Sequence, residues 1–485
     1  MTQSGQPVAQ ERSGTGLVPP LLLALLLVGT AYTGALRVGY ISDDRAFLVE
    51  SPFVKQLLPP LYYFLPITDP TASPAGAYYR PLTNLSHALE RHFLGSDPFW
   101  PHLANVALHL VSVALVYALA RRGEAGPWTA AIAAALFGLF PRLTEAVTWI
   151  SGRATLLSLA CVLGALWLHR SEPERVWRRI AAALALTAGL LCKEFGMVGV
   201  GAITVLELVQ ERRAGAGWRR TLRNLAPALS VAALYVLVRP AYTQSGFDPG
   251  LAQRSLFALQ ALGYDAWMLL NPLTPQMFVG VRGVTEPAYV AAGVALLVAA
   301  GLAAIRLFRR AAPPLEIATF AMAVASTAIT LPFFPIGDIC VTADRFLYPV
   351  VASLAIGLAL ALRAIPPRWT RRAFAAGVAL ALLFELVSVR RNEVWQSELG
   401  LATDTVERTS PKLAPYTFLP HFWLAAVHLC AGRWDEAIAE QELAVRAFTT
   451  YRYVRPDYPE RPGYAEVLWK MKQRAVTHTP RCDYR

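Results

Sequence analysis

The feature that most constrains this sequence is a series of apolar runs, each of roughly 20 residues, that recur between positions 17 and 389. A helix of about 20 residues spans ~30 Å of hydrocarbon, and in lipid only helices and closed barrels satisfy every backbone polar group. The runs are continuous rather than alternating, so they predict helices and not barrel strands. Charged residues make up only 16% of the 485 residues. The sequence therefore predicts an all-α, polytopic membrane protein.

Basic clusters decide the orientation and the number of spans. With the N-terminus in the cytoplasm, about eleven spans place the arginine clusters on the cytoplasmic side. A further span at 255–272 would turn Arg306, Arg309 and Arg310 outward, so this weaker segment is predicted to be a re-entrant or membrane-surface helix. The predicted spans are 17–36, 102–120, 127–141, 146–168, 179–192, 196–210, 222–239, 288–305, 315–335, 346–363 and 373–389.

Composition divides the chain into three regions. Residues 1–16 form a polar tail, predicted to be cytoplasmic, and residues 17–389 form the transmembrane domain, whose first outer loop covers 37–101. Residues 390–485 are polar enough to form a small helical domain on the outer, periplasmic face. The few lysines and many alanines and arginines are typical of a GC-rich bacterial genome, which predicts the bacterial cytoplasmic (inner) membrane as the location.

One segment of the C-terminal domain, at about 416–448, has the pattern of a single tetratricopeptide-like hairpin. The residues that fit this pattern are Leu424, Gly432, Trp434, Ala437 and Ala444. A single repeat cannot bury its own apolar face. We therefore expect the hairpin to dock on the membrane domain.

Several function classes have no support in the sequence. The net charge of +12 does not indicate a nucleic-acid partner, because surplus arginine is what orients a multi-pass protein. The five cysteines lack the spacing of a zinc site. The sequence lacks the nucleotide-binding motif GxxxxGK[ST], so an ATP-driven pump has no support. It also lacks the GxSxG motif of serine hydrolases and the HExxH motif of zinc proteases.

The predicted orientation gathers charged side chains from distant segments at the outer face. They are Asp43 and Asp44 after the first span, Glu145, Lys193 and Glu194, and Asp344 and Arg345. Snorkelling or interfacial ion pairing explains any one of them taken alone. Their common position at one membrane face favours a site.

Carboxylates and cations at a membrane face suit the transfer of a group from a lipid phosphate. The tail of such a donor lies in lipid and its phosphate lies at the interface, where a fixed cation stabilises charge on the leaving group. We predict that Lys193, Arg345 and Arg153 bind the donor phosphate. Asp43 or Asp44 is predicted to be the general base that takes the proton of the acceptor hydroxyl.

Further polar residues are expected to shape the site or to bind the acceptor. They are Arg80, His102, Glu145, Glu194 and Asp344. Arg153 lies inside the predicted fourth span and needs a partner there, for which Glu145 is the expected residue; a purely structural ion pair is an equal alternative for Arg153. No metal ligands are assigned, and a divalent ion such as Mg²⁺ or Mn²⁺ stays open as a cofactor.

The candidate residues belong to motifs that follow one another in a specific order. These are Asp43-Asp44, Tyr79 to Leu82 (YRPL), Trp100 to His109 (WPHLANVALH), Pro141 to Arg153 (PRLTEAVTWISGR), Lys193-Glu194 and Asp344 to Pro349 (DRFLYP). As a set they resemble the GT-C superfamily of polytopic glycosyltransferases. The resemblance is greatest to bacterial relatives of the transmembrane and tetratricopeptide-repeat O-mannosyltransferases, and it covers about residues 17–445.

The resemblance implies a membrane enzyme that moves a sugar, mannose in that group, from a polyprenyl-phosphate donor to a protein or glycan acceptor. It assigns catalysis to an acidic residue of the first outer loop, which corresponds to Asp43 and Asp44. The chain departs from the family pattern at Phe140, Leu143 and Thr155, so a different acceptor or a weaker enzyme stays open. Two alternatives are a transporter or flippase of a lipid-linked sugar and a non-enzymatic membrane scaffold.

Overall fold

The computed structural model of the protein is helical throughout the part of the chain that it describes. The described residues are 18–65, 79–171, 176–215, 217–238, 250–280, 285–331, 340–409, 414–454 and 464–477. Within these ranges the only strand-like pairing is an isolated bridge between Val279 and Thr342. The predicted all-α class is confirmed, whereas the predicted cytoplasmic tail, 1–16, lies outside the described residues.

Each of the predicted spans overlaps a helix, although 146–168 begins on the irregular segment before α8, and residues 17, 239 and 332–335 of three predicted spans lie outside the described residues. These helices are α1 (Val18–Ala31), α5 (Phe99–Arg122), α6 (Pro127–Gly138), α8 (Arg153–Ser171), α9 (Val176–Cys192), α10 (Gly196–Arg213), α11 (Trp218–Val238), α13 (Pro287–Arg309), α14 (Pro314–Thr330), α15 (Leu347–Ala361) and α16 (Pro367–Val394). Seven helices within the described ranges are long and apolar enough to cross a membrane, or up to eight if α6 and the bent segment Pro141–Thr148 form one span. The multi-pass architecture is confirmed, and the count of about eleven spans stays a prediction.

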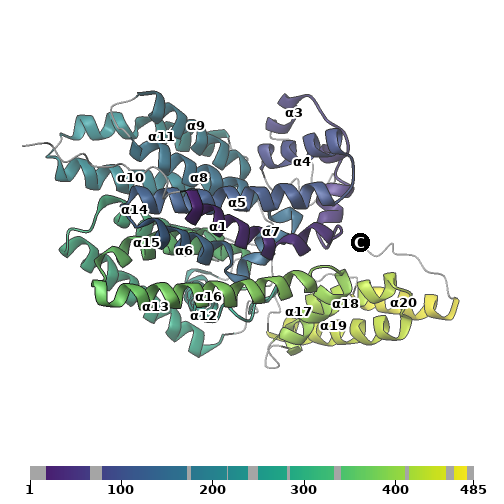
Figure 1. The fold of residues 1–485 in the computed structure, drawn as a ribbon. Coiled ribbons are helices and arrows are strands. Elements are labelled where there is room, and N and C mark those ends of the chain that lie inside the picture. The colour runs from purple at the N-terminus through teal and green to yellow at the C-terminus, as the bar shows by residue number, and fades with distance from the viewer. Residues whose placement is uncertain are drawn as a thin grey trace, which may run out of the picture.

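Local sequence explains where these helices begin and end. Prolines occupy the first turn of α6, α13, α14 and α16, where a missing N–H costs nothing and the fixed φ favours a helix. Arginines occupy the last turn of α5, α10 and α13, where their positive charges interact favourably with the negative end of the helix dipole. In Figure 1 the membrane helices pack side by side, and the C-terminal helices lie at one end of the bundle.

Close helix packing in the bundle depends on glycine at a few positions. A Cβ added at Gly263 would lie 1.8 Å from the carbonyl oxygen of Tyr289, and one added at Gly293 would lie 1.9 Å from that of Leu259. These contacts join α12 (Gly250–Leu270) to α13 along their length. Helix α12 covers residues 255–270 of the weak segment 255–272 and is not among the candidate spans. Its re-entrant or surface position stays a prediction.

The first outer loop contains the amphipathic helix α4 (Pro81–Leu94). Its polar residues Thr83 and His87 are buried against the bundle, whereas Leu89 and Phe93 are exposed. The apolar side of α4 therefore faces away from the protein, as expected for a helix that contacts lipid at the membrane surface.

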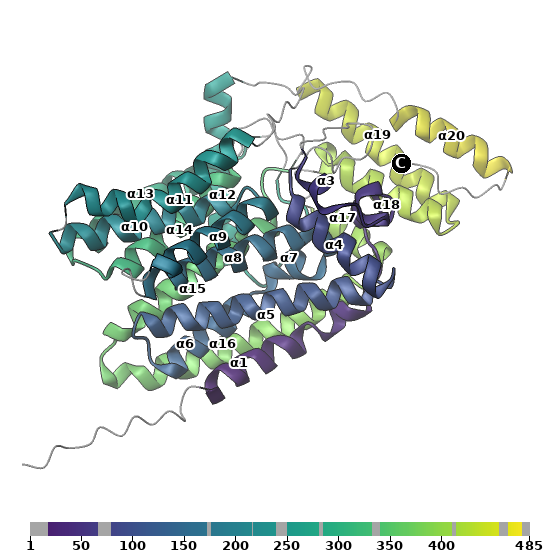
Figure 2. The same cartoon turned by 90° about the horizontal axis from the view of Figure 1, so that it is seen from above.

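The C-terminal region consists of α17 (Glu398–Arg408), α18 (Phe418–Cys430), α19 (Trp434–Val454) and α20 (Tyr464–Thr477). Helices α18 and α19 pack together across a short turn at Gly432, whose φ of +72° favours glycine. Figures 1 and 2 place this region at the same end of the molecule as α3 (Pro60–Phe64) and α4. The helical hairpin predicted at about 416–448 corresponds to α18 and α19, and its tetratricopeptide character stays a prediction.

Candidate functional site

A short irregular segment, residues 141–153, forms the centre of the candidate site. It comprises η4 (Pro141–Leu143), α7 (Thr144–Thr148) and η5 (Ile150–Gly152), and α8 follows at Arg153. The chain doubles back so closely here that a Cβ added at Gly152 would lie 2.2 Å from the carbonyl oxygen of Ala146. The side chains of this segment consequently point toward several different parts of the molecule.

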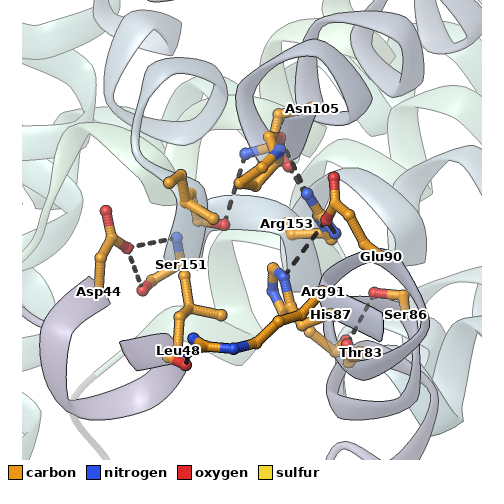
Figure 3. Close-up of polar contacts among 12 residues, drawn as sticks. Asp44, Leu48, Thr83, Ser86, His87, Glu90, Arg91, Asn105, Ser151 and Arg153 are labelled. Atoms are coloured by element: carbon orange, nitrogen blue, oxygen red, sulfur yellow. Dashed lines mark hydrogen bonds and ion pairs between the residues drawn. The ribbon is translucent and has the colours of Figure 1, made fainter. Parts of the chain in front are cut away.

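We define the acidic loop as residues 39–47, which follow α1 and contain Asp43 and Asp44. This loop is hydrogen-bonded to the segment 141–153 through Asp44 (Figure 3). Oδ1 of Asp44 accepts bonds from the hydroxyl of Ser151 at 2.5 Å and from its N–H at 2.9 Å, while Oδ2 accepts the N–H of Ile41 at 3.3 Å. Asp44 is only 1% exposed. Burial raises the pKa of Asp44 to about 7, although these hydrogen bonds act to lower it. Asp43, by contrast, is exposed, so the two adjacent carboxylates have different environments.

Glu145 pairs with Arg345 at the start of the DRF turn. One carboxylate oxygen accepts from Nη1 of Arg345 at 2.5 Å and the other from its backbone N–H at 2.8 Å. The guanidinium also lies 5.4 Å from the ring of Trp149 and 5.1 Å from the ring of Phe346. Glu145 is buried, whereas the side chain of Arg345 keeps 23% exposure. Arg345 can therefore face a ligand while it stays anchored.

The predicted pairing of Glu145 with Arg153 is wrong. Arg153 forms an ion pair with Glu90 of α4, and it donates to Oδ1 of Asn105 at 2.9 Å and to the carbonyl of Pro101 at 2.8 Å (Figure 3). The turn at Ile150–Gly152 separates the two residues, so that Glu145 and the Arg153 guanidinium meet different neighbours. Arg153 joins α4, α5 and α8 in the structure.

Lys193 lies in the short connection between α9 and α10, near two arginines. Its Nζ donates to the hydroxyl of Thr155 at 2.8 Å and lies 5.9 Å from the ring of Phe346. Burial lowers the pKa of Lys193 to about 7, and the positive charges of Arg80 and Arg345 act in the same direction. The structure thus brings together three cations from distant segments.

Arg80 and Glu194 form the edge of this group. They make an ion pair at 3.3 Å, and both keep part of their surface exposed. We define the outer cluster as Arg80, Glu145, Lys193, Glu194 and Arg345. All five are residues that the sequence analysis selected, and the outer cluster contains three basic and two acidic side chains.

Asp344 and His102 are fully enclosed by the protein. Asp344 accepts from Arg142 at 2.6 Å and from the N–H of Gln276 at 2.8 Å. Arg142, itself 0% exposed, also donates to the carbonyl of Asn271 from Nε at 3.0 Å and from Nη2 at 2.8 Å. His102 is 0% exposed on α5. In the described part of the chain, no three His, Cys, Asp or Glu side chains are grouped so that they could hold a metal ion.

Four residues at the site were not selected from the sequence as site residues. They are Glu90, Asn105, Arg142 and Ser151. Asn105, Arg142 and Ser151 lie inside the motifs WPHLANVALH and PRLTEAVTWISGR, so the motifs contained the signal. Glu90 lies in the amphipathic helix α4, and only the fold brings it to Arg153.

A largely apolar cavity of about 980 Å³ opens between α6, α13, α14, α15 and α16. Of its lining residues, Phe140 lies two residues before Arg142 and Pro272 directly follows Asn271, and Arg306 and Arg310 line it as well. The cavity therefore extends from the region of the site along the membrane helices.

Comparison with known proteins gives a consistent family of relatives. The chain is 31% identical over 245 residues to protein O-mannosyl-transferase Tmtc2 of Drosophila melanogaster, which covers 47% of this chain and 25% of that protein. It is 27% identical over 435 residues to TMTC3 of Mus musculus, covering 78% of this chain and 46% of that protein. For TMTC1 of Homo sapiens the identity is 24% over 511 residues, covering 92% and 57%.

The chain thus spans between a quarter and little more than half of the length of these relatives. No protein-family model matches it. Among solved structures, ArnT from Cupriavidus metallidurans in the apo state aligns with 90% of this chain and 75% of its own, at 16% identity and a TM-score of 0.42. The sequence relatives confirm the resemblance to the transmembrane and tetratricopeptide-repeat O-mannosyltransferases that the ordered motifs predict.

Proposed function

We propose that this protein is an integral-membrane glycosyltransferase that moves a sugar from a polyprenyl phosphate to an acceptor hydroxyl at the outer face of the membrane. The observation that carries the proposal is the outer cluster, in which Arg80, Lys193 and Arg345 gather at the ends of apolar helices. The segment 141–153 that anchors Arg345 also anchors Asp44. An anion site and a proton acceptor are therefore linked by one rigid segment.

The outer cluster suits the phosphate of the donor. Among the described residues its three cations are grouped with two carboxylates, and burial, together with the charges of Arg80 and Arg345, lowers the pKa of Lys193. A bound phosphate would add negative charge beside these cations, and the fixed cations would stabilise the charge that develops on the leaving phosphate. Arg345 and Lys193 are proposed to contact the phosphate directly. The apolar cavity is suited to the polyprenyl tail.

Asp44 is the proposed general base. A carboxyl with a pKa near the working pH combines a useful fraction of the ionised form with basic strength, and the pKa of Asp44 is raised to about 7. As the acceptor oxygen forms its bond to the anomeric carbon, the bond to the phosphate oxygen breaks, and Asp44 takes the hydroxyl proton. Attack from the side opposite the phosphate inverts the anomeric centre. Asp43, on the exposed side of the loop, is proposed to meet the acceptor.

The remaining candidate residues are proposed to position these groups. Arg153 donates to three protein acceptors, so we now propose that it fixes α4 and α5 beside the site rather than binding phosphate. Glu194 orients Arg80, and Asp344 together with Arg142 holds the DRF turn. His102, which is buried on α5, is proposed to support the segment 141–153.

Mannose and a protein hydroxyl are the proposed sugar and acceptor, because the sequence relatives are named protein O-mannosyl-transferases. The proposed location is the bacterial cytoplasmic membrane. The N-terminal tail would then lie in the cytoplasm, and α17 to α20 would lie on the periplasmic side beside the site.

The test is transfer of radiolabelled mannose from synthetic polyprenyl-phosphate donors by the full chain in nanodiscs. Wild type is compared with Asp44→Asn and Asp43→Asn. We expect Asp44→Asn to lose at least about 100-fold in turnover, the range for a missing general base, while the protein stays folded and binds donor. Donor that is bound but never consumed by wild type would support a lipid-linked-sugar transporter instead. Absence of donor binding would support a scaffold.

A further inference from the structure

The carboxylate of Glu398 contacts both sides of the acidic loop and also the C-terminal hairpin. Glu398 is the first residue of α17. Its Oε1 accepts the N–H of Ser42 at 3.3 Å and the indole N–H of Trp423 at 3.4 Å, and its Oε2 pairs with Arg45 at 3.0 Å. Ser42 and Arg45 flank Asp43 and Asp44 in the sequence, whereas Trp423 belongs to α18.

Ser42, whose N–H bonds to Glu398, has an unfavourable backbone conformation. Ser42 has a φ of +53°, in the left-handed region that non-glycine residues adopt only at a cost. A conformation of this kind persists when its surroundings fix it. The N–H of Ser42 bonds to Glu398, and two residues later the carboxylate of Asp44 bonds to Ser151. The loop is thus held from two sides.

Side-chain packing and a helix cap fix the backbone on which Glu398 lies. Trp395, three residues earlier, is fully buried in an apolar cluster with Val38, Ile41, Trp149 and Leu401. The hydroxyl of Ser397 caps α17 by accepting the N–H of Gly400 at 2.9 Å. The carboxylate of Glu398 therefore has a fixed position relative to the loop that it contacts.

We propose that Glu398 is a positioning residue that sets the acidic loop and, through Trp423, couples the position of the C-terminal hairpin to it. A ligand that shifts α18 would then shift the loop that carries Asp44. The catalytic consequence rests on the proposed function. The structural coupling can be measured without any turnover.

Reorientation of a catalytic group by about 1 Å can reduce turnover by 100-fold. Release of Ser42 would let the loop relax near Ser42, while the bonds that Asp44 accepts from Ser151 and Ile41 remain. The expected kinetic effect is therefore a lower kcat. Donor affinity should stay constant, because the cations of the outer cluster do not contact the loop through any bond described above.

The experiment measures amide hydrogen–deuterium exchange of the segment 39–47 in the full chain in nanodiscs. The variants are Glu398→Ala, Glu398→Gln and Trp423→Phe, with Glu407→Gln as a matched control, because Glu407 is an exposed glutamate of the same helix. We expect exchange at 42–45 to rise about tenfold in Glu398→Ala and less in the other two, since lost protection reports local opening. Glu407→Gln should match wild type, and α8 should exchange equally slowly in all proteins.

Turnover is measured on the same samples. We expect Glu398→Ala to lower kcat by about tenfold with an unchanged KM for the donor, and Glu398→Gln to recover part of the loss. Unchanged exchange at 39–47 in Glu398→Ala would overturn the coupling, whatever the activity. Faster exchange in Glu398→Ala but not in Trp423→Phe would overturn the part assigned to α18. If exchange responds but wild type transfers no sugar, the coupling stands and the proposed function fails.

Discussion

Two buried polar clusters lie at the two ends of α8, and they differ in how their charges are balanced. Arg153 begins this helix beside the outer cluster, and His169 lies 16 residues further along, about 24 Å away at 1.5 Å per residue. We define the inner cluster as His169, Arg179, Glu207, Glu211 and Asn224. Both clusters draw residues from several helices.

The inner cluster is balanced by its own members together with Arg220, which pairs with Glu211 at 3.2 Å. Nε2 of His169 lies 2.7 Å from Glu207, and the amide of Asn224 donates to Glu207 at 3.4 Å and to Glu211 at 3.3 Å. Arg179 donates to the amide oxygen of Asn224. Each charge in this cluster faces an opposite charge or an amide, and Glu207 is only 1% exposed.

The outer cluster, by comparison, has a surplus of positive charge, because among the described residues it has one more cation than carboxylate. Arg80 and Arg345 keep 22% and 23% of their side chains exposed, and Arg220 at the inner end keeps 49%, so the charge count and not the exposure distinguishes the two clusters. Buried pairs that are fully satisfied hold helices in register and contribute little beyond that. A cluster with surplus charge and an accessible edge can instead accept an anionic ligand. Burial of charge alone therefore does not distinguish a site from a structural ion pair. The balance of charges among the described residues is the feature in which the two clusters differ.

The largest expected difference comes from removing one arginine from each end. Arg345→Ala deletes a proposed phosphate contact, and we expect kcat/KM for the lipid donor to fall at least about 100-fold. The matched inner variant is Arg220→Ala, because Arg220 also pairs with a buried glutamate, Glu211, at 3.2 Å. We expect it to leave kcat/KM within about twofold of wild type.

Steady-state kinetics with a polyprenyl-phosphate sugar, together with thermal unfolding of both variants, provides the measurement. Arg345→Lys serves as a second outer variant that keeps the charge and loses the paired geometry, so an intermediate rate is expected. Equal losses of activity in Arg345→Ala and Arg220→Ala would contradict the distinction between the two clusters.

The pH dependence sharpens the comparison at Lys193. The pKa of Asp44 is raised to about 7, so its basic form increases as pH rises through 7, and the pKa of Lys193 is lowered to about 7, so its charge is lost over the same range. We expect a bell-shaped profile of kcat/KM with a maximum near 7. Lys193→Arg keeps its charge at higher pH, so the fall on the alkaline side should disappear while the acid side stays.

The control for this profile is Lys55→Arg, which makes the same substitution in the exposed part of the first outer loop. Its profile should match wild type. If Lys193→Arg retains the wild-type alkaline fall, then the loss of charge on Lys193 is not what limits donor binding.

The helices and the outer cluster could be predicted from the sequence because their signals are local. Apolar runs, proline starts and arginine ends determine where α5, α13 and α16 lie. The orientation rule then placed Glu145, Lys193 and Arg345 at one end, where the structure brings them together. These inferences need no knowledge of how one helix packs on another.

The pairings within the site could not be predicted in the same way. Glu145 and Arg153 are eight residues apart, and a continuous helix would place them two turns apart on nearby faces. The structure instead breaks the helix at Ile150–Gly152, where Gly152 approaches Ala146, and sends Arg153 toward Glu90. Long-range packing of α4 decides this pairing.

A smaller effect is expected when the inner cluster loses its central amide. Asn224→Ala removes a bridge between Glu207 and Glu211, so two buried carboxylates lose a donor. We expect a loss of about 1–3 kcal/mol of stability, the cost of a buried group left unsatisfied, with turnover at permissive temperature unchanged. Thermal unfolding in detergent, with Asn84→Ala at a partly exposed position of α4 as a reference for a mild substitution, checks this. A fall in kcat without a fall in stability would assign the inner cluster a part in the reaction.

The smallest effect is expected at an exposed ion pair of the outer end. Arg45 pairs with Glu398 at 3.0 Å, but its side chain is 57% exposed. Solvent screening and side-chain entropy limit pairs of this kind to about 0–1 kcal/mol. Arg45→Ala should therefore leave the unfolding temperature nearly unchanged and produce less exchange at 42–45 than Glu398→Ala, because the bonds from Ser42 and Trp423 to Glu398 remain. A loss as large as that of Glu398→Ala would mean that the exposed ion pair, rather than the backbone bond at Ser42, holds the acidic loop.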